Sequence, residues 1–238
     1  MSIKILHLYH DLMNLYGESG NIKVLKRYLN DQRLDVEIDF KGIEDEIDFD
    51  KYAFIYVGAG MESNQKLALE HLLGYKEKII ELVNSGTIFL FTGNAMEMLG
   101  KRIISKDGKI YKGLGIFDFI STETDQRYTG DVICNFDKLQ EPIVGFINRC
   151  TTIDNLEKSL FTVSMSFGGT EFSGFEGVKL NNLFGTYLIG PILAKNPHFG
   201  EYITKLILKN CGKEEYIDTD YKYAKESYNV TLKNLTGK

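Results

Sequence analysis

The residues best placed to do chemistry follow the apolar segment TIFLF at positions 87–91. In an open parallel sheet, ligands gather at the carboxyl ends of the strands, and this segment is predicted to be such a strand. A strand that turns sharply into a helix forms a nucleophile elbow, which holds one strained residue beside backbone N–H groups for an oxyanion. Glycine occupies the tip of this predicted elbow, so a plain tight turn explains it fully. The residues concerned are Gly93, Asn94, Ala95, Met96 and Glu97.

Few other side chains could supply a catalytic group near this elbow. Glu97 is predicted to lie on the first helical turn, where it could activate water, although stabilisation of the helix start is the favoured interpretation. His7 and His10 end the first predicted strand, and a packing role is favoured for His7. Cys134 and Cys150 are distant from the elbow in sequence and are interpreted as small buried hydrophobes.

The glycine-rich loop Gly58-Ala59-Gly60 follows another predicted strand. It resembles the start of a dinucleotide fingerprint, but the next residues, Met61-Glu62-Ser63, supply no third glycine, so no nicotinamide cofactor is expected. Its backbone N–H groups could still bind a carboxylate or an amide. The chain contains neither CxxC nor HExxH, so the sequence predicts no metal site and no cofactor.

The hydrophobic pattern predicts an α/β fold with a mainly parallel central sheet flanked by helices. Apolar runs predict strands, and apolar residues at helical spacing predict helices between them. The second half, with the short runs DVICNF, PIVGFI and LFTVSMSF, is predicted to be a strand-rich extension of the same sheet. The predicted strands are 3–9, 36–40, 53–57 and 87–91, and the predicted helices are 20–30, 65–84 and 199–211.

The chain is long enough for one substantial core, and no linker or repeat divides it. We therefore predict one domain over residues 1–212, followed by a charged C-terminal tail or helix over residues 213–238. That last stretch could be solvated or could dock a partner, and the solvated interpretation is favoured.

The composition is that of an ordinary soluble globular protein, with a net charge of -5. This charge argues against a nucleic-acid binder that coats phosphates. No apolar run approaches the length of a membrane span, and the segment MSIKILHLYH lacks the order of a signal peptide. Three scattered cysteines suit free thiols in a reducing compartment, so a cytoplasmic location is expected.

Several segments together resemble a known family, the glutaminase subunit of lipid II isoglutaminyl synthase. That subunit belongs to the wider cobyric-acid-synthase-like (CobB/CobQ-like) glutamine amidotransferases. The resemblance covers nearly the whole chain and implies a single class I glutamine amidotransferase-like, flavodoxin-like domain. The matching segments are His7 to Ile22, Gly58-Ala59-Gly60 with Gln65, Arg127 with Gly130-Asp131, Val144-Gly145-Phe146 with Asn148, and Glu176 to Pro191.

The chain departs from this family where the family's chemistry resides. Members resembling it carry a catalytic cysteine after the elbow strand, where this chain has Gly93. Their acid–base histidine, in Gly-Thr-Tyr-Leu-His-Gly-Pro, corresponds to Ile189, and their Phe-Glu-Asn-His segment corresponds to residues 146–149, which read Phe-Ile-Asn-Arg. Hydrolysis of glutamine requires a thiolate to attack the amide and an imidazole to move protons. The resemblance therefore implies a degenerate member that has no catalytic residues and does not hydrolyse glutamine.

The resemblance also implies a cleft and a partner. In the family the loop at residues 58–60 lies near the oxyanion, and Arg127 matches a position near the active site or partner interface, although a solvated loop arginine is an equal alternative. The implied partner is a Mur-ligase-like ATP-dependent ligase subunit, in a heterodimer that amidates a peptidoglycan precursor. The predicted cleft residues are Gly58, Ala59, Gly60, Asn94, Glu97, Arg127 and Asn148.

Two other functions are open on the sequence. The chain could be a small-molecule binding module that retains the cleft for glutamine or another amide. It could instead be a repurposed enzyme, with Glu97, Asn94 and His7 acting together in a remodelled cleft or in a cobyric-acid-synthase-like pathway.

Overall fold

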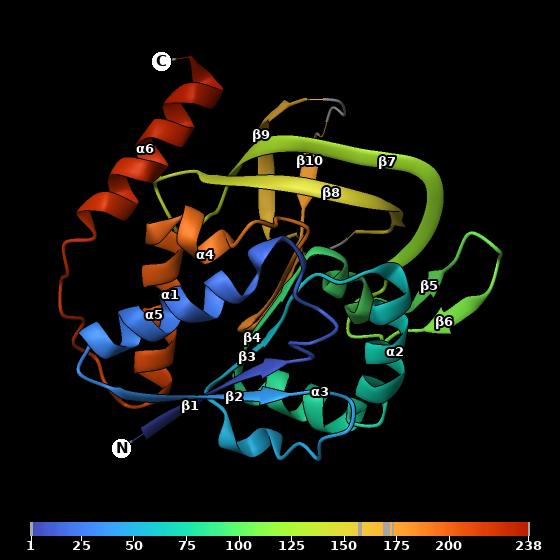
Figure 1. The fold of residues 1–238 in the computed structure, drawn as a ribbon, viewed down its shortest axis with the longest axis horizontal. Coiled ribbons are helices and arrows are strands. Elements are labelled where there is room, and N and C mark those ends of the chain that lie inside the picture. The colour runs from blue at the N-terminus through green and yellow to red at the C-terminus, as the bar shows by residue number, and fades with distance from the viewer. Residues whose placement is uncertain (1, 157–158, 169–171, 173, 238) are drawn as a thin grey trace.

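The computed structural model describes residues 2–156, 159–168, 172 and 174–237, and it contains two six-stranded sheets (Figure 1). The first sheet has the order β11-β12-β4-β3-β1-β2. All of its neighbouring strands pair in parallel except β11 with β12. Its strands are β1 (Ser2–Leu8), β2 (Asp35–Lys41), β3 (Phe54–Val57), β4 (Ile88–Thr92), β11 (Val178–Leu180) and β12 (Leu183–Thr186).

Helices cover both faces of this first sheet, as predicted for a doubly wound α/β fold. Figure 1 shows α1, α4 and α5 on one side and α2 and α3 on the other. Strands β3 and β4 are buried at every position, which matches their continuous apolar sequences. The helices are α1 (Ser19–Asp31), α2 (Glu62–Leu73), α3 (Lys76–Ser85), α4 (Ile192–Lys195) and α5 (Pro197–Asn210), and the short 3₁₀ helices are η1 (Leu15–Gly17), η2 (Phe49–Lys51) and η3 (Gly93–Leu99).

The helix predicted over residues 65–84 is two helices. Helix α2 ends at Leu73 and α3 begins at Lys76, with Gly74 as the C-cap between them. Glycine has a low helix propensity and readily ends a helix, whereas the apolar periodicity continues through both helices and hides the break.

The predicted strand-rich extension of the first sheet is wrong, because these strands form a second, separate sheet. Its order is β10-β9-β7-β5-β6, and β8 pairs with β7. Strand β7 pairs antiparallel with β8, which follows it after a short connection, and also pairs antiparallel with β9. Its strands are β5 (Arg102–Ile104), β6 (Ile110–Lys112), β7 (Ile120–Asn135), β8 (Ile143–Asp154), β9 (Phe161–Phe167) and β10 (Gly174–Glu176).

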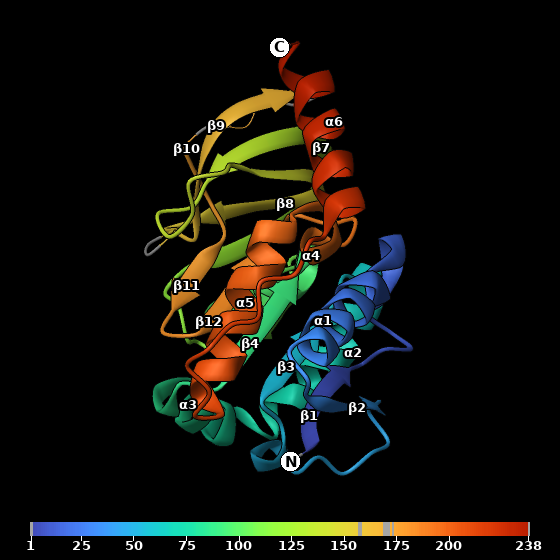
Figure 2. The same ribbon diagram turned by 90° about the vertical axis from the view of Figure 1, so that its left-hand side faces the viewer.

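The charged C-terminal stretch contains a helix, α6 (Lys222–Thr236), that lies beside the second sheet (Figure 2). Its buried Tyr228 packs with Ile133 and Val144 and donates a hydrogen bond of 2.8 Å to the carbonyl of Pro142. The segment before α6 contacts α1, where Tyr221 stacks on Tyr28 with ring centroids 4.0 Å apart. None of the helices that the structure describes is both long enough and apolar enough to cross a membrane.

Candidate functional site

The elbow lies at the carboxyl end of β4, in the middle of the first sheet. Gly93 directly follows the strand, has a φ of +60°, and begins the 3₁₀ helix η3. A β-carbon built on Gly93 would lie 2.5 Å from the Ala59 Cβ and 3.1 Å from the Ile189 Cγ2. Real β-carbons essentially never approach another atom within 3.0 Å. The backbone therefore has the shape of a strand-to-helix elbow, but neighbouring side chains already fill the space of a nucleophile.

Ile189 faces this elbow, so the structure brings together the two positions that the sequence comparison singled out. Its backbone N–H donates to the carbonyl of Phe146 at 2.9 Å, which forms an isolated bridge to β8. The side chain is buried and cannot transfer a proton. The contact between Gly93 and Ile189 is thus apolar, where acyl transfer would need a thiol and an imidazole.

Gly60, in the loop before α2, and Asn94, the residue after Gly93, form two hydrogen bonds with each other. The Gly60 N–H donates to the Asn94 Oδ1 at 3.0 Å, and the Asn94 Nδ2 donates to the Gly60 carbonyl at 2.9 Å. The side chain of Asn94 therefore occupies a backbone donor that an oxyanion would need. Gly58, also predicted for the cleft, lies further back, where a β-carbon would meet the Met13 carbonyl at 2.5 Å.

These residues surround a small hollow, which we call the elbow recess. Its volume is about 20 Å³, which is room for about one water molecule. Its rim carries a chain of hydrogen bonds, from the Arg127 Nη1 to the Asn148 Oδ1 at 2.7 Å and from the Asn148 Nδ2 to the Tyr16 hydroxyl at 3.2 Å. The recess is lined by Tyr16, Ala59, Gly60, Glu62, Gly93, Asn94, Glu97, Arg127, Asn148, Arg149, Cys150 and Thr151.

Glu97 forms the buried floor of the recess. Its carboxylate accepts hydrogen bonds from the Thr151 hydroxyl at 2.6 Å, the Tyr187 hydroxyl at 2.8 Å and the Gln65 Nε2 at 2.8 Å. Burial raises the pKa of Glu97, and these hydrogen bonds oppose the rise. A carboxylate engaged by three donors holds η3, α2 and β8 together, so its contacts indicate a structural role.

A second buried carboxylate, Glu18, forms hydrogen bonds with residues on both sides of the elbow. The sequence interpretation did not single it out as a site residue. It accepts hydrogen bonds from the Tyr56 hydroxyl at 2.6 Å, from the Thr92 hydroxyl and from the Gly190 N–H at 3.1 Å. Burial raises its pKa. Thr92 precedes Gly93 and Gly190 follows Ile189, so Glu18 links the two segments that meet at the elbow.

Cys150 is distant from the elbow in sequence, but the structure places it in the recess. Its thiol donates to the Glu62 Oε1 at 3.1 Å, and burial with this carboxylate raises the pKa of Cys150 to about 12. A thiol with that pKa stays protonated at neutral pH and is a poor nucleophile. The other recess residues that were not predicted for the cleft are Tyr16, Glu62, Arg149 and Thr151. Tyr16 belongs to the N-terminal family signature, and Arg149 to the segment at residues 146–149.

His7 does not line the recess that the described residues form. It is fully buried among Tyr56, Phe40 and His10, and burial lowers the pKa of His7 to about 4. The imidazole is therefore neutral and packed, as the sequence interpretation favoured. Since His7 does not join Glu97 and Asn94 in the recess, the repurposed enzyme that would use those three side chains has no geometric support.

The crowding at the elbow predicts that a cysteine cannot be restored there without cost. We expect Gly93→Cys to lower the free energy of unfolding by about 2 kcal/mol, because its β-carbon would overlap Ala59 and the residue keeps a positive φ. In an Ala59→Gly background the same change is expected to cost about 1 kcal/mol less. Urea unfolding of the wild-type protein, Gly93→Cys, Ala59→Gly and the double variant measures both costs. Equal costs in the two backgrounds would show that Ala59 does not fill the position.

Comparison with known proteins identifies the family. Residues 4–197 match the model of the CobB/CobQ-like glutamine amidotransferase domain. The chain is 32% identical over 212 residues to "Lipid II isoglutaminyl synthase (glutamine-hydrolyzing) subunit GatD" of Staphylococcus aureus. The match covers 89% of this chain and 86% of that protein. The subunit of the same name from Streptococcus pneumoniae is 29% identical over 216 residues, covering 89% and 83%.

Solved structures show the same fold at low sequence identity. A glutamine amidotransferase from Thermotoga maritima matches with a TM-score of 0.56 and 14% identity, over 98% of this chain and 94% of that one. These structures share the fold, and the family match over residues 4–197 places the chain in the glutamine amidotransferase class. Within that class, this chain belongs to the family of CobB/CobQ-like glutamine amidotransferase domains.

Proposed function

We propose that this protein is a catalytically silent glutamine amidotransferase-like subunit of a complex that amidates the peptidoglycan precursor lipid II. The observation that carries the proposal is the occupied elbow: Gly93 has no side chain, and Ala59 and Ile189 fill the space around it. The similarity to two lipid II isoglutaminyl synthase subunits supports the pathway. The proposed place of action is the cytoplasm.

The relatives' name describes a subunit, which implies a second chain. We infer that this second chain is a Mur-ligase-like, ATP-dependent ligase that activates the carboxylate to be amidated. A silent subunit would then position or stabilise the ligase, which would take free ammonia. The rim of the elbow recess offers a surface for such a contact. Hydrogen bonds there hold the side chains of Arg127, Asn148 and Tyr16 together.

A glutamine-binding module is less well supported. The elbow recess has room for about one water molecule, and Asn94 already occupies the Gly60 N–H. A role in a cobyric-acid-synthase-like pathway is also less well supported, because this chain spans only 32% of the length of the probable cobyric acid synthase from Methanothermobacter thermautotrophicus.

Co-expression with the Mur-ligase-like protein of the same organism tests the proposal. We expect the two chains to co-purify as a 1:1 complex on size exclusion with light scattering, whereas an unrelated ATP-dependent ligase from the same cells should not be retained. The complex is expected to amidate lipid II with ammonium chloride and not with glutamine. A chain that stays monomeric in the presence of the ligase, or amidation supported by glutamine, would contradict the proposal.

A further inference from the structure

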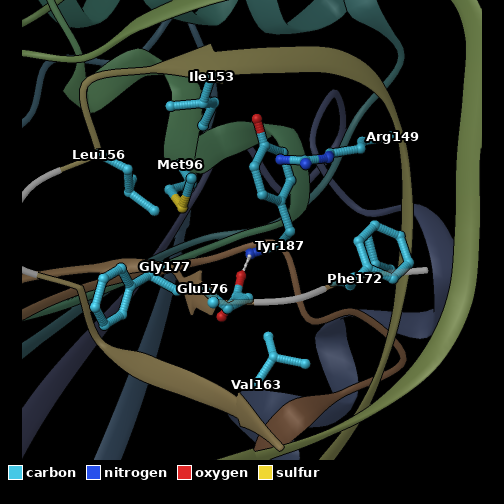
Figure 3. Close-up of a pocket in the computed structure, with 12 residues that line it drawn as sticks. Met96, Arg149, Ile153, Leu156, Val163, Phe172, Glu176, Gly177 and Tyr187 are labelled. Carbon is cyan, nitrogen blue, oxygen red and sulfur yellow. Dashed lines mark hydrogen bonds between the residues drawn. The ribbon is translucent and has the colours of Figure 1, made fainter. Parts of the chain in front are cut away.

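A second cavity, much larger than the elbow recess, lies between the second sheet and the end of β12 (Figure 3). We call it the inter-sheet cavity. Its volume is about 490 Å³, which falls within the range of small-molecule binding sites. Its walls come from η3, β8, β9, β10 and the residue after β12, so it exists only once both sheets have formed.

The guanidinium of Arg149 is the one cation among the described residues that line this cavity. It sits over the ring of Tyr187 at 4.6 Å from the centroid, and the ring of Phe172 lies 6.0 Å away (Figure 3). These aromatic faces hold the planar group in place. The Nε of Arg149 is buried without a hydrogen-bond partner. The guanidinium interacts electrostatically with the Glu97 and Glu176 carboxyl groups.

Most of the other side chains in the wall are apolar, although polar atoms make up slightly more than half of the exposed wall. Val163 and Phe172 face the cavity from one side, and Met96, Ile153 and Leu156 face it from the other (Figure 3). A wall of this composition would cover a hydrocarbon chain or ring and remove it from water, at a gain of roughly 25 cal/mol per Å² of apolar surface.

Among the described residues of this wall, the one carboxyl group is that of Glu176, and it is turned toward the protein. Its oxygens accept hydrogen bonds from the Thr186 hydroxyl at 2.8 Å and the Tyr187 N–H at 2.6 Å. Burial raises the pKa of Glu176 to about 7, so a large fraction of the molecules carry it uncharged at neutral pH. Glu176 therefore makes its hydrogen bonds to the β12 end of the protein and not to Arg149.

We propose that the inter-sheet cavity binds a small amphipathic carboxylate, with the carboxylate on the Arg149 guanidinium and the apolar part against Val163, Phe172 and Met96. A planar guanidinium can bind a carboxylate through two parallel hydrogen bonds. Arg149 also lines the elbow recess, but neither Gly93 nor Ile189 lines the inter-sheet cavity. Binding here therefore requires neither a catalytic role nor a ligase partner.

Calorimetric titration with octanoate, and with octanamide as its uncharged match, tests the site. We expect octanoate to bind with saturation at one molecule per chain, and octanamide to bind at least tenfold more weakly. Arg149→Met is expected to weaken octanoate at least tenfold and to leave octanamide unchanged, since it keeps the apolar stem. Arg149→Lys, which keeps the charge, should retain a preference for octanoate.

Val163→Phe, which narrows the cavity, is expected to weaken both ligands, and circular dichroism establishes that each variant is folded. The proposal is overturned if the wild-type protein shows no saturable binding of octanoate or binds octanoate and octanamide equally. Equal octanoate affinity in the wild-type protein and Arg149→Met would also overturn it, as would full affinity in Val163→Phe, because the ligand would then lie elsewhere.

Discussion

The purified protein is expected to release glutamate from glutamine at a rate about a millionfold below that of a family member with an intact cysteine. The reaction needs a thiolate for attack and an imidazole for proton transfer, and the corresponding positions are Gly93 and Ile189. Other groups in the recess do not replace these two. The Gly60 N–H is already hydrogen-bonded to Asn94, and the Cys150 thiol stays protonated and is a poor nucleophile.

A coupled glutamate dehydrogenase assay, run with the protein alone and with its ligase partner, measures this rate. The matched variant Gly93→Cys/Ile189→His carries both family residues, and we expect it to remain inactive because Ala59 and Asn94 still occupy the elbow. A covalent adduct of the wild-type protein with a glutamine-mimicking electrophile, found by mass spectrometry within the recess, would refute the prediction.

The second large effect is a pH-dependent loss of stability caused by Glu176. The carboxyl is buried between β10 and β12, and burial raises its pKa from the ordinary value of 4.5 to about 7. The folded protein therefore holds this proton more tightly than the unfolded chain does. The stabilisation of the folded protein by the protonated Glu176 is fully present below pH 4.5 and is lost as the pH rises through 7. A difference of this size corresponds to about 3 kcal/mol.

Glu176→Gln removes the titration while keeping the shape of the side chain. We expect the free energy of unfolding of the wild-type protein, measured relative to this variant, to fall by about 3 kcal/mol between pH 4.5 and pH 8. Glu214→Gln, at an exposed position, is the control and should show no such change. Urea unfolding across this pH range measures the difference. A constant difference for Glu176→Gln would mean that the buried carboxyl does not titrate in this window.

The first half of the fold could be predicted because its signals are local. Strands β3 and β4 are continuous apolar runs, and α1 shows apolar residues at helical spacing. Parallel strands alternate with helices along the chain, so the order of elements predicts the sheet. The second half carries strands without helices between them, and nothing local distinguishes strands added to an existing sheet from strands that pair with one another.

The cleft was predicted in part for the same reason. Ala59, Gly60, Asn94 and Glu97 follow strands of the parallel sheet, and the structure brings all four into the elbow recess. Cys150 reaches the same recess from β8 of the second sheet, so its place could not be inferred from its position in the chain.

The sequence by itself determined which catalytic atoms are missing, because the residue type at a position can be read without knowing the fold. There is no sulfur at Gly93 and no ring nitrogen at Ile189. Only the tertiary structure decided what took their place. Segments far apart in the chain meet where Ala59 fills the space beside Gly93, in the Gly60–Asn94 hydrogen bonds and at the cavity beside Arg149. Contacts of this kind depend on distances in space, which periodicity and spacing along one strand or helix do not contain.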